Sequence, residues 1–384
     1  MNDFVKRAEE LFDEMVRNRR YLHENAETGM VLPKTVKYVK KELIRYGYDP
    51  KMIGGGITCT VGKGERTLLL RADMDALPQE EISGLPFACK TGACHSCGHD
   101  FHTTMLLAAA KMLKERENEL TNTIKLLFQP GEEVLQGAKA MIREGILENP
   151  RVDCAYAMHC LQYDSGSIVY RYGSTRGACA FMIRIHGKSC HGARPYEGVS
   201  AAVVAADILL SVQRLVSAEM QPKDENVISF GSIQAGTVSN IVPGEAVLMG
   251  SIRSYDNQNT AYMKDRLIQI VQNIATANRA SAEVVFDPEV GSLKNDKEMV
   301  DEFSEYLRQV TPNCVERQGN DPGTEDFAAF GEFVPSMLAN IGVGSIEEGY
   351  IYGSHNPKRT LDEKAMIHGA ACYANCAYQW ANHH

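Results

Sequence analysis

Short apolar segments of strand length alternate with longer, helix-like segments along most of this 384-residue chain. The predicted strands, each a short apolar run that closes on polar residues, are TLLLRADMD (67–75), TIKLLFQ (123–129) and CAYAMH (154–159). The predicted helices are 4–19, 34–46 and 103–115. Such alternation predicts an α/β fold with a mixed central sheet flanked by helices.

The pattern changes after residue 176. The next predicted elements are a strand, a helix, two strands, a helix and a strand, at 179–187, 198–219, 226–236, 245–255, 258–277 and 282–287. This β-α-β-β-α-β order is that of a ferredoxin-like α+β domain. After residue 291 the chain returns to a helix, the short strand PSMLAN and a C-terminal helix from about 362. We therefore predict a catalytic domain at 1–176 and 292–384, interrupted by a smaller domain at 177–291.

Net charge and cysteine usage narrow the class of partner. A formal net charge of −9 argues against a nucleic-acid-binding protein, which normally presents a basic face. The N-terminal stretch is amphipathic and rich in acids, and apolar stretches such as MLLAAA are too short to span a bilayer. The 11 cysteines are odd in number and scattered, which favours reduced thiols. We therefore expect a cytoplasmic protein with no membrane or nucleic-acid partner.

The densest polar cluster is CHSCGHDFH, from Cys94 to His102. Cys94 and Cys97 could form a redox pair, but the strand-then-helix context of such a pair is missing. They could also form half of a zinc ribbon, but the sequence contains no second CxxC. A simpler alternative is a loop whose polar residues cap the next helix. The remaining alternative is a metal-binding loop, in which the thiolate of Cys97 and the imidazole of His99 are ligands.

Two further predicted strands end on side chains suited to metal chemistry. FQPGEE places Glu132 and Glu133 directly after one strand, and His159 closes another. At the carboxyl end of a central strand, one carboxylate can bind a metal while its neighbour accepts a proton from water. His355 lies in the polar loop GSHNP. Each histidine alone is more often structural, but together these residues predict a hydrolytic metal site.

Seven motifs in order along the chain resemble those of the M20 metallopeptidases. They are RADMDALP (71–78), CGHDFHT (97–103), FQPGEE (128–133), GKSCHGARP (187–195), SNIVPGEAVLMGSIRS (239–254), TEDF (324–327) and GSHNP (353–357). More specifically, they resemble the amidohydrolase branch, which contains N-acyl-amino-acid hydrolases, hippurate hydrolase and auxin-conjugate hydrolases. The motifs span nearly the whole chain, so accidental similarity is an insufficient explanation.

The resemblance implies two divalent metal ions per subunit, Zn²⁺ or Mn²⁺, with Co²⁺ or Ni²⁺ as alternatives. The implied ligands are Cys97, whose thiolate would bridge the two ions, His99, Glu133, His159 and His355. Glu132 matches the general base and acid.

Four further residues acquire roles from the resemblance. His191, in the inserted domain, matches a histidine that stabilises the tetrahedral oxyanion, and in related dimers it reaches into the partner's active site. Asn240 and Arg253 match residues that recognise the substrate's carboxylate end, although a turn residue and a surface charge are the simpler alternatives. Asp75 matches a residue behind the ligands that orients an imidazole, or it merely caps the loop into Pro78.

These assignments imply an amidohydrolase that removes the acyl group from an N-acyl amino acid. A dipeptidase or carboxypeptidase using the same residues is the main alternative. A non-catalytic metal-dependent sensor is a second, but it would lack Glu132 or a ligand, and none is missing from the sequence. The apolar helix predicted at 198–219 and the neighbouring sheet predict a homodimer formed through the inserted domain, with a helix that packs only on its own sheet as the alternative.

Overall fold

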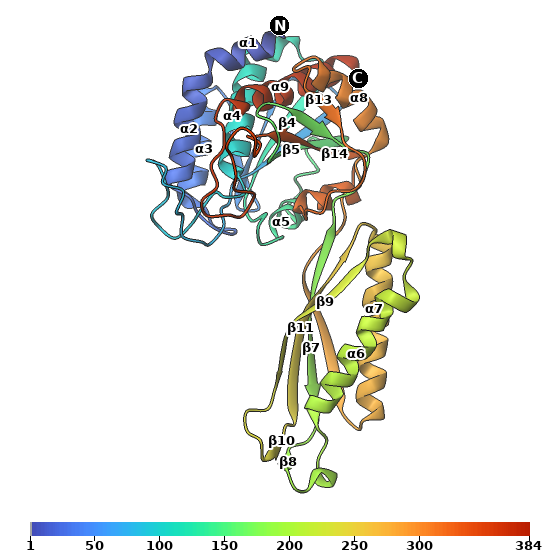
Figure 1. Ribbon diagram of the computed structural model, residues 1–384. Coiled ribbons are helices and arrows are strands. Elements are labelled where there is room, and N and C mark those ends of the chain that lie inside the picture. The colour runs from blue at the N-terminus through green and yellow to red at the C-terminus, as the bar shows by residue number, and fades with distance from the viewer. Residues whose placement is uncertain (1) are drawn as a thin grey trace. The chain divides into compact units, whose positions relative to one another are not determined.

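The computed structural model describes residues 2–384, which form two compact units (Figure 1). Unit 1 comprises the described residues up to Gly173 together with Lys294–Gly319 and Ala329–His384. Unit 2 comprises Ser174–Leu293 and Asn320–Ala328, so a short segment near the C-terminal part of the chain returns to it. The catalytic role predicted for the first domain and the lid or dimerisation role predicted for the second stay predictions.

Unit 1 is built on an eight-stranded sheet of order β1-β2-β4-β3-β5-β14-β6-β13. The strands are β1 (Lys51–Ile53), β2 (Gly56–Val61), β3 (Thr67–Asp73), β4 (Thr123–Gln129), β5 (Cys154–Leu161), β6 (Ile168–Tyr170), β13 (Cys314–Glu316) and β14 (Ser336–Gly342). β4, β3, β5 and β14 run parallel, whereas β2 and β6 pair antiparallel with this group. Every residue of β3 and β4 is buried, as expected of central strands covered on both faces. The predicted mixed α/β sheet is confirmed.

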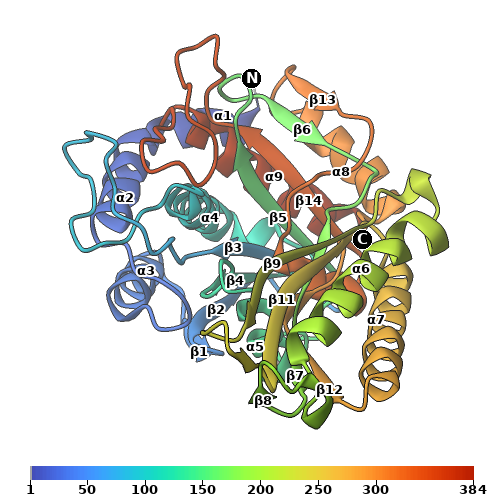
Figure 2. The ribbon, with the colours of Figure 1, turned by 60° about the horizontal axis from the view of Figure 1, so that its bottom comes forward.

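Seven helices of the described part of unit 1 flank this sheet. They are α1 (Asp3–Glu10), α2 (Phe12–Glu24), α3 (Pro33–Arg45), α4 (His99–Glu115), α5 (Gly137–Arg143), α8 (Lys297–Arg308) and α9 (Ala365–His383). α4 and α9 are buried along most of their length and pack on each other and on β3. Figure 2 shows α2, α3 and α4 side by side. The single helix predicted at 4–19 divides at Leu11 into α1 and α2.

The start of α4 differs from the prediction in a way that matters for the site. The helix begins at His99 rather than at Thr103, so the HDFH stretch forms its first turn. Gly98 precedes it with a φ of 100°, in the left-handed region that glycine adopts without strain. This glycine lets the chain turn sharply from the Cys97 loop into the helix.

Unit 2 contains a four-stranded antiparallel sheet of order β12-β7-β11-β9 with two helices. Its elements are β7 (Gly177–His186), β8 (Cys190–His191), α6 (Ala201–Glu219), β9 (Val227–Ala235), β10 (Ile241–Val242), β11 (Glu245–Ser254), α7 (Asn257–Ala277) and β12 (Ser281–Val290). α6 and α7 lie side by side against the sheet (Figure 1). The order of the four long strands confirms the ferredoxin-like prediction, and β8 and β10 add a short two-stranded sheet.

One described helix, α6, is long and apolar enough to cross a membrane when judged by length and composition alone. Its buried residues are Ala201, Val204, Ala205, Ile208, Val212 and Leu215. They recur at helical spacing and join the hydrophobic core of unit 2. Packing against its own sheet therefore accounts for these six residues of α6, whereas Val203 and Leu210 stay exposed.

Candidate metal centre and active site

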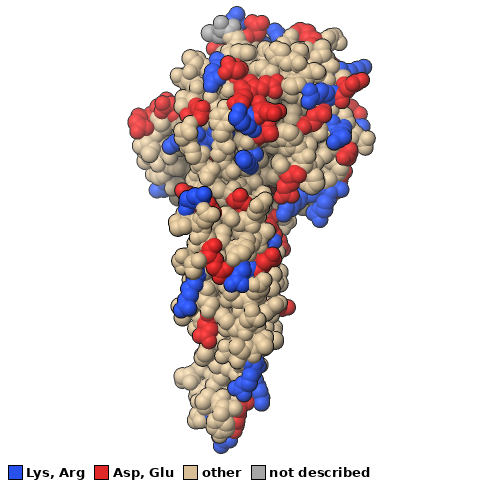
Figure 3. All heavy atoms as spheres, turned by 90° about the vertical axis from the view of Figure 1, so that its right-hand side faces the viewer, with Lys and Arg blue, Asp and Glu red and all other residues tan. Residues whose placement is uncertain are grey.

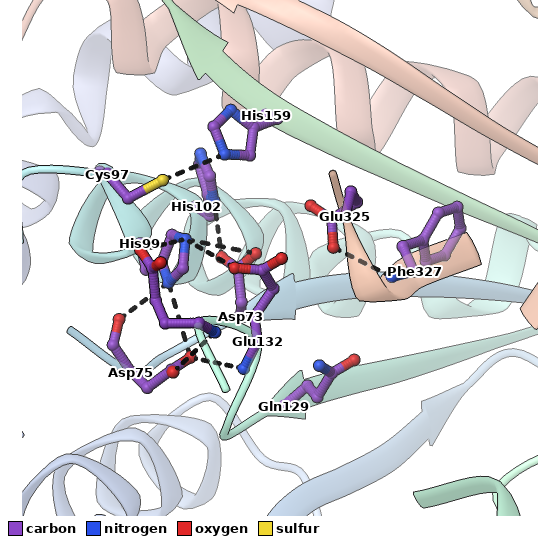
Figure 4. A network of polar contacts seen from close by, with 12 residues as sticks. Asp73, Asp75, Cys97, His99, His102, Gln129, Glu132, His159, Glu325 and Phe327 are labelled. Carbon is purple, nitrogen blue, oxygen red and sulfur yellow. Dashed lines mark hydrogen bonds and ion pairs between the residues drawn. The ribbon is translucent and has the colours of Figure 1, made fainter. Parts of the chain in front are cut away.

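The carboxyl ends of the parallel strands β4, β3 and β5 meet at one edge of the unit 1 sheet, where α/β proteins commonly form their sites. Asp75 follows β3, and Glu132 and Glu133 follow β4. His159 lies near the end of β5, which continues to Leu161 rather than closing at the histidine as predicted. The first turn of α4 reaches the same edge (Figure 4).

The buried His99 and the half-buried His159 present their Nε2 atoms to the same space. His99 Nδ1 lies 2.8 Å from the backbone oxygen of Asp75, and His159 Nδ1 lies 3.1 Å from that of Cys160. Because a carbonyl oxygen only accepts, each Nδ1 carries a proton, which leaves Nε2 as the ring atom that can bind a metal. His159 Nε2 lies 3.4 Å from the Cys97 sulfur. His99 Nε2 is buried and has no hydrogen-bond partner.

The two adjacent glutamates are fixed through their backbones. Asp75 accepts hydrogen bonds from the Glu132 and Glu133 N–H groups, at 3.0 and 3.1 Å. The carboxylate of Asp75 thus orients the glutamate loop, and its backbone oxygen orients His99. Glu133 Oε1 is buried without a hydrogen-bond partner, while its Oε2 lies 3.7 Å from His355 Nε2. His355 is more exposed than the other four predicted metal ligands, with 56% of its side chain exposed.

The five predicted ligands are therefore brought together in unit 1. Three overlapping groups each have their ligand atoms within 4.8 Å of one another: Cys97, His99 and His159; Cys97, Glu133 and His355; and His99, Glu132 and Glu133. Two observations fit a metal pair. Buried ligand atoms of His99 and Glu133 lack hydrogen-bond partners, and the donor set of thiolate, imidazoles and carboxylate suits Zn²⁺ and related ions.

Protons and a metal ion compete for the ligand atoms of this cluster. Burial raises the pKa of the Cys97 thiol, and burial likewise raises the pKa of Glu133. Burial works against a charged His99, but Asp73 and Cys97 outweigh it and raise the pKa of this imidazole. Since a metal ion needs the deprotonated forms, metal binding releases protons and weakens as the pH falls.

A second buried pair, Asp73 and His102, was missed by the sequence analysis. His102 lies one helical turn after His99, and its Nδ1 is 2.6 Å from Asp73 Oδ1. Its Nε2 accepts a hydrogen bond from the Cys160 N–H at 2.8 Å, so the ring ties β3 to β5. Burial alone would raise the pKa of Asp73, but His99 and Arg71 hold it well below its usual range. The signal that could have found this pair is the i, i+3 spacing of the two histidines.

Arg359 was also missed. It is buried, and its Nη1 donates to the backbone oxygens of Ser96 and Cys97, both at 2.9 Å. Its Nη2 lies 3.4 Å from the backbone oxygen of Cys160. One guanidinium thereby joins the Cys97 loop to the end of β5, beside two predicted ligands. Nothing in the sequence around Arg359 distinguishes it from a surface arginine.

The remaining predicted residues lie in unit 2. His191, on β8, is exposed, and its Nδ1 accepts a hydrogen bond from the Ala193 N–H at 3.1 Å. The β8–β10 pairing places His191 opposite Ile241, and the Gly192 N–H donates to the Asn240 backbone oxygen at 2.8 Å. Arg253 lies on β11. The structure describes each unit by itself, so the roles of His191, Asn240 and Arg253 toward a substrate stay predictions.

Comparison with known proteins gives consistent matches over nearly the whole chain. The model of the peptidase family M20/M25/M40 matches residues 69–379. An IAA-amino acid hydrolase, ILR1-like 2 of Arabidopsis thaliana, is 34% identical over 98% of this chain and 87% of its own length. Thermostable carboxypeptidase 2 of Saccharolobus solfataricus is also 34% identical, over 98% of this chain and 97% of its own length.

The fold agrees with a solved structure as well. The YXEP protein of Bacillus subtilis, described as a dinuclear metal-binding peptidase from the M20 family, superposes with a TM-score of 0.83. The two sequences are 27% identical, and the match covers 97% of this chain and 99% of the other. A neighbour that binds two metals supports the interpretation of the cluster at the edge of the unit 1 sheet as a metal site.

Proposed function

The chain belongs to peptidase family M20/M25/M40, and on this premise we propose that it hydrolyses the amide bond of N-acyl amino acids. Family membership makes it a metal-dependent hydrolase. The observation that carries the narrower proposal is a cluster of candidate metal ligands directly beside Glu132, combined with a half-buried arginine, Arg253, suited to a free carboxylate. The A. thaliana relative, which is named an IAA-amino acid hydrolase, supports the same substrate class.

Glu132 is the proposed general base and acid. It is buried, and its Oε2 lies 3.8 Å from His99 Nε2, so it borders the ligand cluster. Two divalent metal ions held by Cys97, His99, Glu133, His159 and His355 would supply the Lewis acidity that acidifies water and polarises the amide carbonyl. Glu132 would take the proton of the attacking water and return it to the leaving amine, so no covalent intermediate is needed.

His191, Asn240 and Arg253 would act on the substrate from unit 2. The Nε2 of an imidazole can donate a hydrogen bond to a developing oxyanion, and His191 is exposed on its strand. Asn240 and Arg253 would recognise the carboxylate end, since an arginine fork pairs with a carboxylate through two hydrogen bonds. Recognition of a free carboxylate would make the enzyme exo-acting.

The metal identity, assembly and location are part of the same proposal. The thiolate of Cys97 favours Zn²⁺, while the imidazole and carboxylate ligands also suit Mn²⁺, Co²⁺ or Ni²⁺. We further propose a cytoplasmic homodimer that assembles through unit 2. This assembly rests on the exposed apolar face of α6 beside the edge strand β9.

A carboxypeptidase or dipeptidase is the alternative that a specific observation favours. The S. solfataricus relative is as similar to this chain as the plant hydrolase, at 34% sequence identity, and is named a carboxypeptidase. The same residues would attack a peptide bond next to a C-terminal carboxylate. The two functions differ in the acyl part of the substrate.

The test is a panel of N-acetyl, N-benzoyl and longer N-acyl amino acids alongside dipeptides. Chelated enzyme should be inactive, and added Zn²⁺, Mn²⁺ or Co²⁺ should restore cleavage of the N-acyl amino acids. Cleavage of dipeptides alone would favour the alternative.

Glu132→Gln tests the mechanism in the same assay. Because it removes the base while keeping a side chain of the same shape, kcat should fall by about 10²–10⁴-fold with both metals retained. Retained metal with a near wild-type rate would overturn the role of Glu132.

A further inference from the structure

We propose that Thr324 is a positioning residue for substrate specificity, because its hydroxyl holds the Arg253 guanidinium in place for a substrate carboxylate. Both residues belong to unit 2. The inference rests on the proposed function, in which Arg253 binds the carboxylate end of the substrate. It adds a residue to which neither the motifs nor the comparisons give a role.

Arg253 has an unusual set of contacts for a half-buried arginine. It lies on β11 between Ala178 of β7 and Val227 of β9, so the sheet fixes its backbone on both sides. Its Nη1 donates to Thr324 Oγ1 at 2.9 Å. Among residues 2–384 no carboxylate forms an ion pair with it. A guanidinium has five N–H donors, so four remain for a ligand.

The hydroxyl of Thr324 can interact with the Arg253 guanidinium only as a hydrogen-bond acceptor. It donates its single proton to the backbone oxygen of Arg176 at 2.8 Å. Its lone pairs are therefore the only groups that it can offer to Arg253, and they accept from Nη1. The hydroxyl is thus a fixed acceptor rather than a rotating one, and it holds one corner of the guanidinium plane.

The backbone beneath Thr324 is held to the start of β7. The Arg176 N–H donates to the backbone oxygen of Gly323 at 2.9 Å, and the Asp321 N–H donates to that of Ser174 at 2.8 Å. The turn that carries Thr324 is therefore anchored to the segment directly before β7, the strand next to the one that carries Arg253. Main-chain hydrogen bonds within unit 2 set the relative position of hydroxyl and guanidinium, which a flexible surface contact could not do.

Fixing one corner of the guanidinium determines where its other donors point. With Nη1 committed to Thr324, the remaining donors define the plane in which a carboxylate can pair with two parallel hydrogen bonds. Without the hydroxyl, the side chain can rotate and must be ordered by the substrate itself, which weakens binding. Loss of Thr324 should therefore act on carboxylate recognition rather than on bond cleavage.

The experiment compares Thr324→Val, which removes the hydroxyl at nearly constant volume, with Thr324→Ser, which keeps it. For each enzyme, kcat and KM are measured on an N-acyl amino acid and on the corresponding carboxamide. Thr324→Val should raise KM for the carboxylate substrate about tenfold with little change in kcat, and lower the carboxylate-to-carboxamide ratio of kcat/KM about tenfold. Thr324→Ser should keep the ratio. Thr276→Val, the same change at an exposed position of α7, is the matched control.

Arg253→Met separates failure of this inference from failure of the proposed function. If Arg253→Met lowers the ratio and Thr324→Val does not, the positioning role is overturned and the role of Arg253 stands. If Arg253→Met leaves the ratio unchanged, carboxylate recognition by Arg253 is itself wrong. An equal loss on both substrates in Thr324→Val would show a merely structural hydroxyl and overturn the inference.

A binding measurement keeps the comparison valid if the wild-type enzyme cleaves neither substrate. Calorimetric titration of the metal-loaded wild type and Thr324→Val with the N-acyl amino acid and its carboxamide gives the same ratio from Kd. A tenfold smaller carboxylate preference in the variant supports the inference, and equal preferences overturn it.

Discussion

At the scale of single residues, backbone oxygens hold much of the candidate centre in place. Those of Asp75 and Cys160 orient His99 and His159. Arg359 bonds to those of Ser96, Cys97 and Cys160. A sequence predicts side-chain chemistry, but which carbonyl faces which ring depends on the folded backbone. For this reason the predicted ligands could be named from motifs, whereas Arg359 could not.

Replacing Arg359 by Met should weaken metal binding. The change keeps the aliphatic stem but leaves buried carbonyl oxygens without their donor, which loosens the Cys97 loop relative to β5. We expect metal affinity to fall about 10–100-fold, as is typical when a group that supports metal ligands is lost. Competition with a chromophoric chelator measures the affinity. Arg143→Met, at an exposed position of α5, is the control. Equal metal affinities in both variants would contradict the role of Arg359 in holding the Cys97 loop to β5.

At the scale of elements, Glu14 joins three helices of unit 1. It lies on α2, accepts a hydrogen bond from Tyr46 at the end of α3 at 2.6 Å, and pairs with Lys111 of α4 at 2.8 Å. Arg45 also donates to it. Burial alone would raise the pKa of Glu14, but Lys111, Tyr46 and Arg45 lower it to about 2.

This shift predicts a specific loss of stability in acid. A carboxyl whose pKa is lower in the folded state adds stability above its unfolded value near 4.5, and this contribution is lost as the pH falls toward 2. Allowing for solvent screening, we expect Glu14→Gln to cost roughly 1 kcal/mol at pH 7 and little at pH 2.5. Thermal unfolding between these pH values measures the difference. Glu24→Gln, exposed on the same helix, should show no such pH-dependent difference.

The elements themselves were predicted unevenly. β3, β4 and β5 are buried apolar runs, and they stand out in the sequence. β1, β13 and β10 are only two or three residues long and mostly exposed, so they carry no periodic signal. The start of α4 was misplaced because its first turn is polar yet buried around the candidate metal site. Polar residues that serve a site look like a loop to any method that reads hydrophobic periodicity.

At the scale of the whole molecule, the motifs predicted the family and the fold class, because motif order follows the chain through both units. The sequence says less about the binding partners of the chain. The formal net charge of −9 is the difference between 49 acidic and 40 basic residues. Figure 3 shows acidic and basic side chains interspersed over the face it displays, with wide uncharged areas over unit 2. A face without one dominant sign agrees with a small-molecule substrate, and its uncharged part over unit 2 is consistent with self-association.

The proposed dimer can be tested on the exposed face of α6. Val203 and Leu210 are two turns apart and 57% and 60% exposed, and α6 packs beside β9, an edge strand with 55% of Ile233 exposed. An edge strand has unpaired backbone groups that a second copy can complete, with the apolar helix faces packing together. We therefore expect the double variant Val203→Glu/Leu210→Glu to be monomeric by light scattering, where the wild type is dimeric. Val285→Glu, on the opposite edge strand β12, should remain dimeric. A monomeric wild type at about 50 μM, well above the Kd of a stable homodimer, would contradict the assembly.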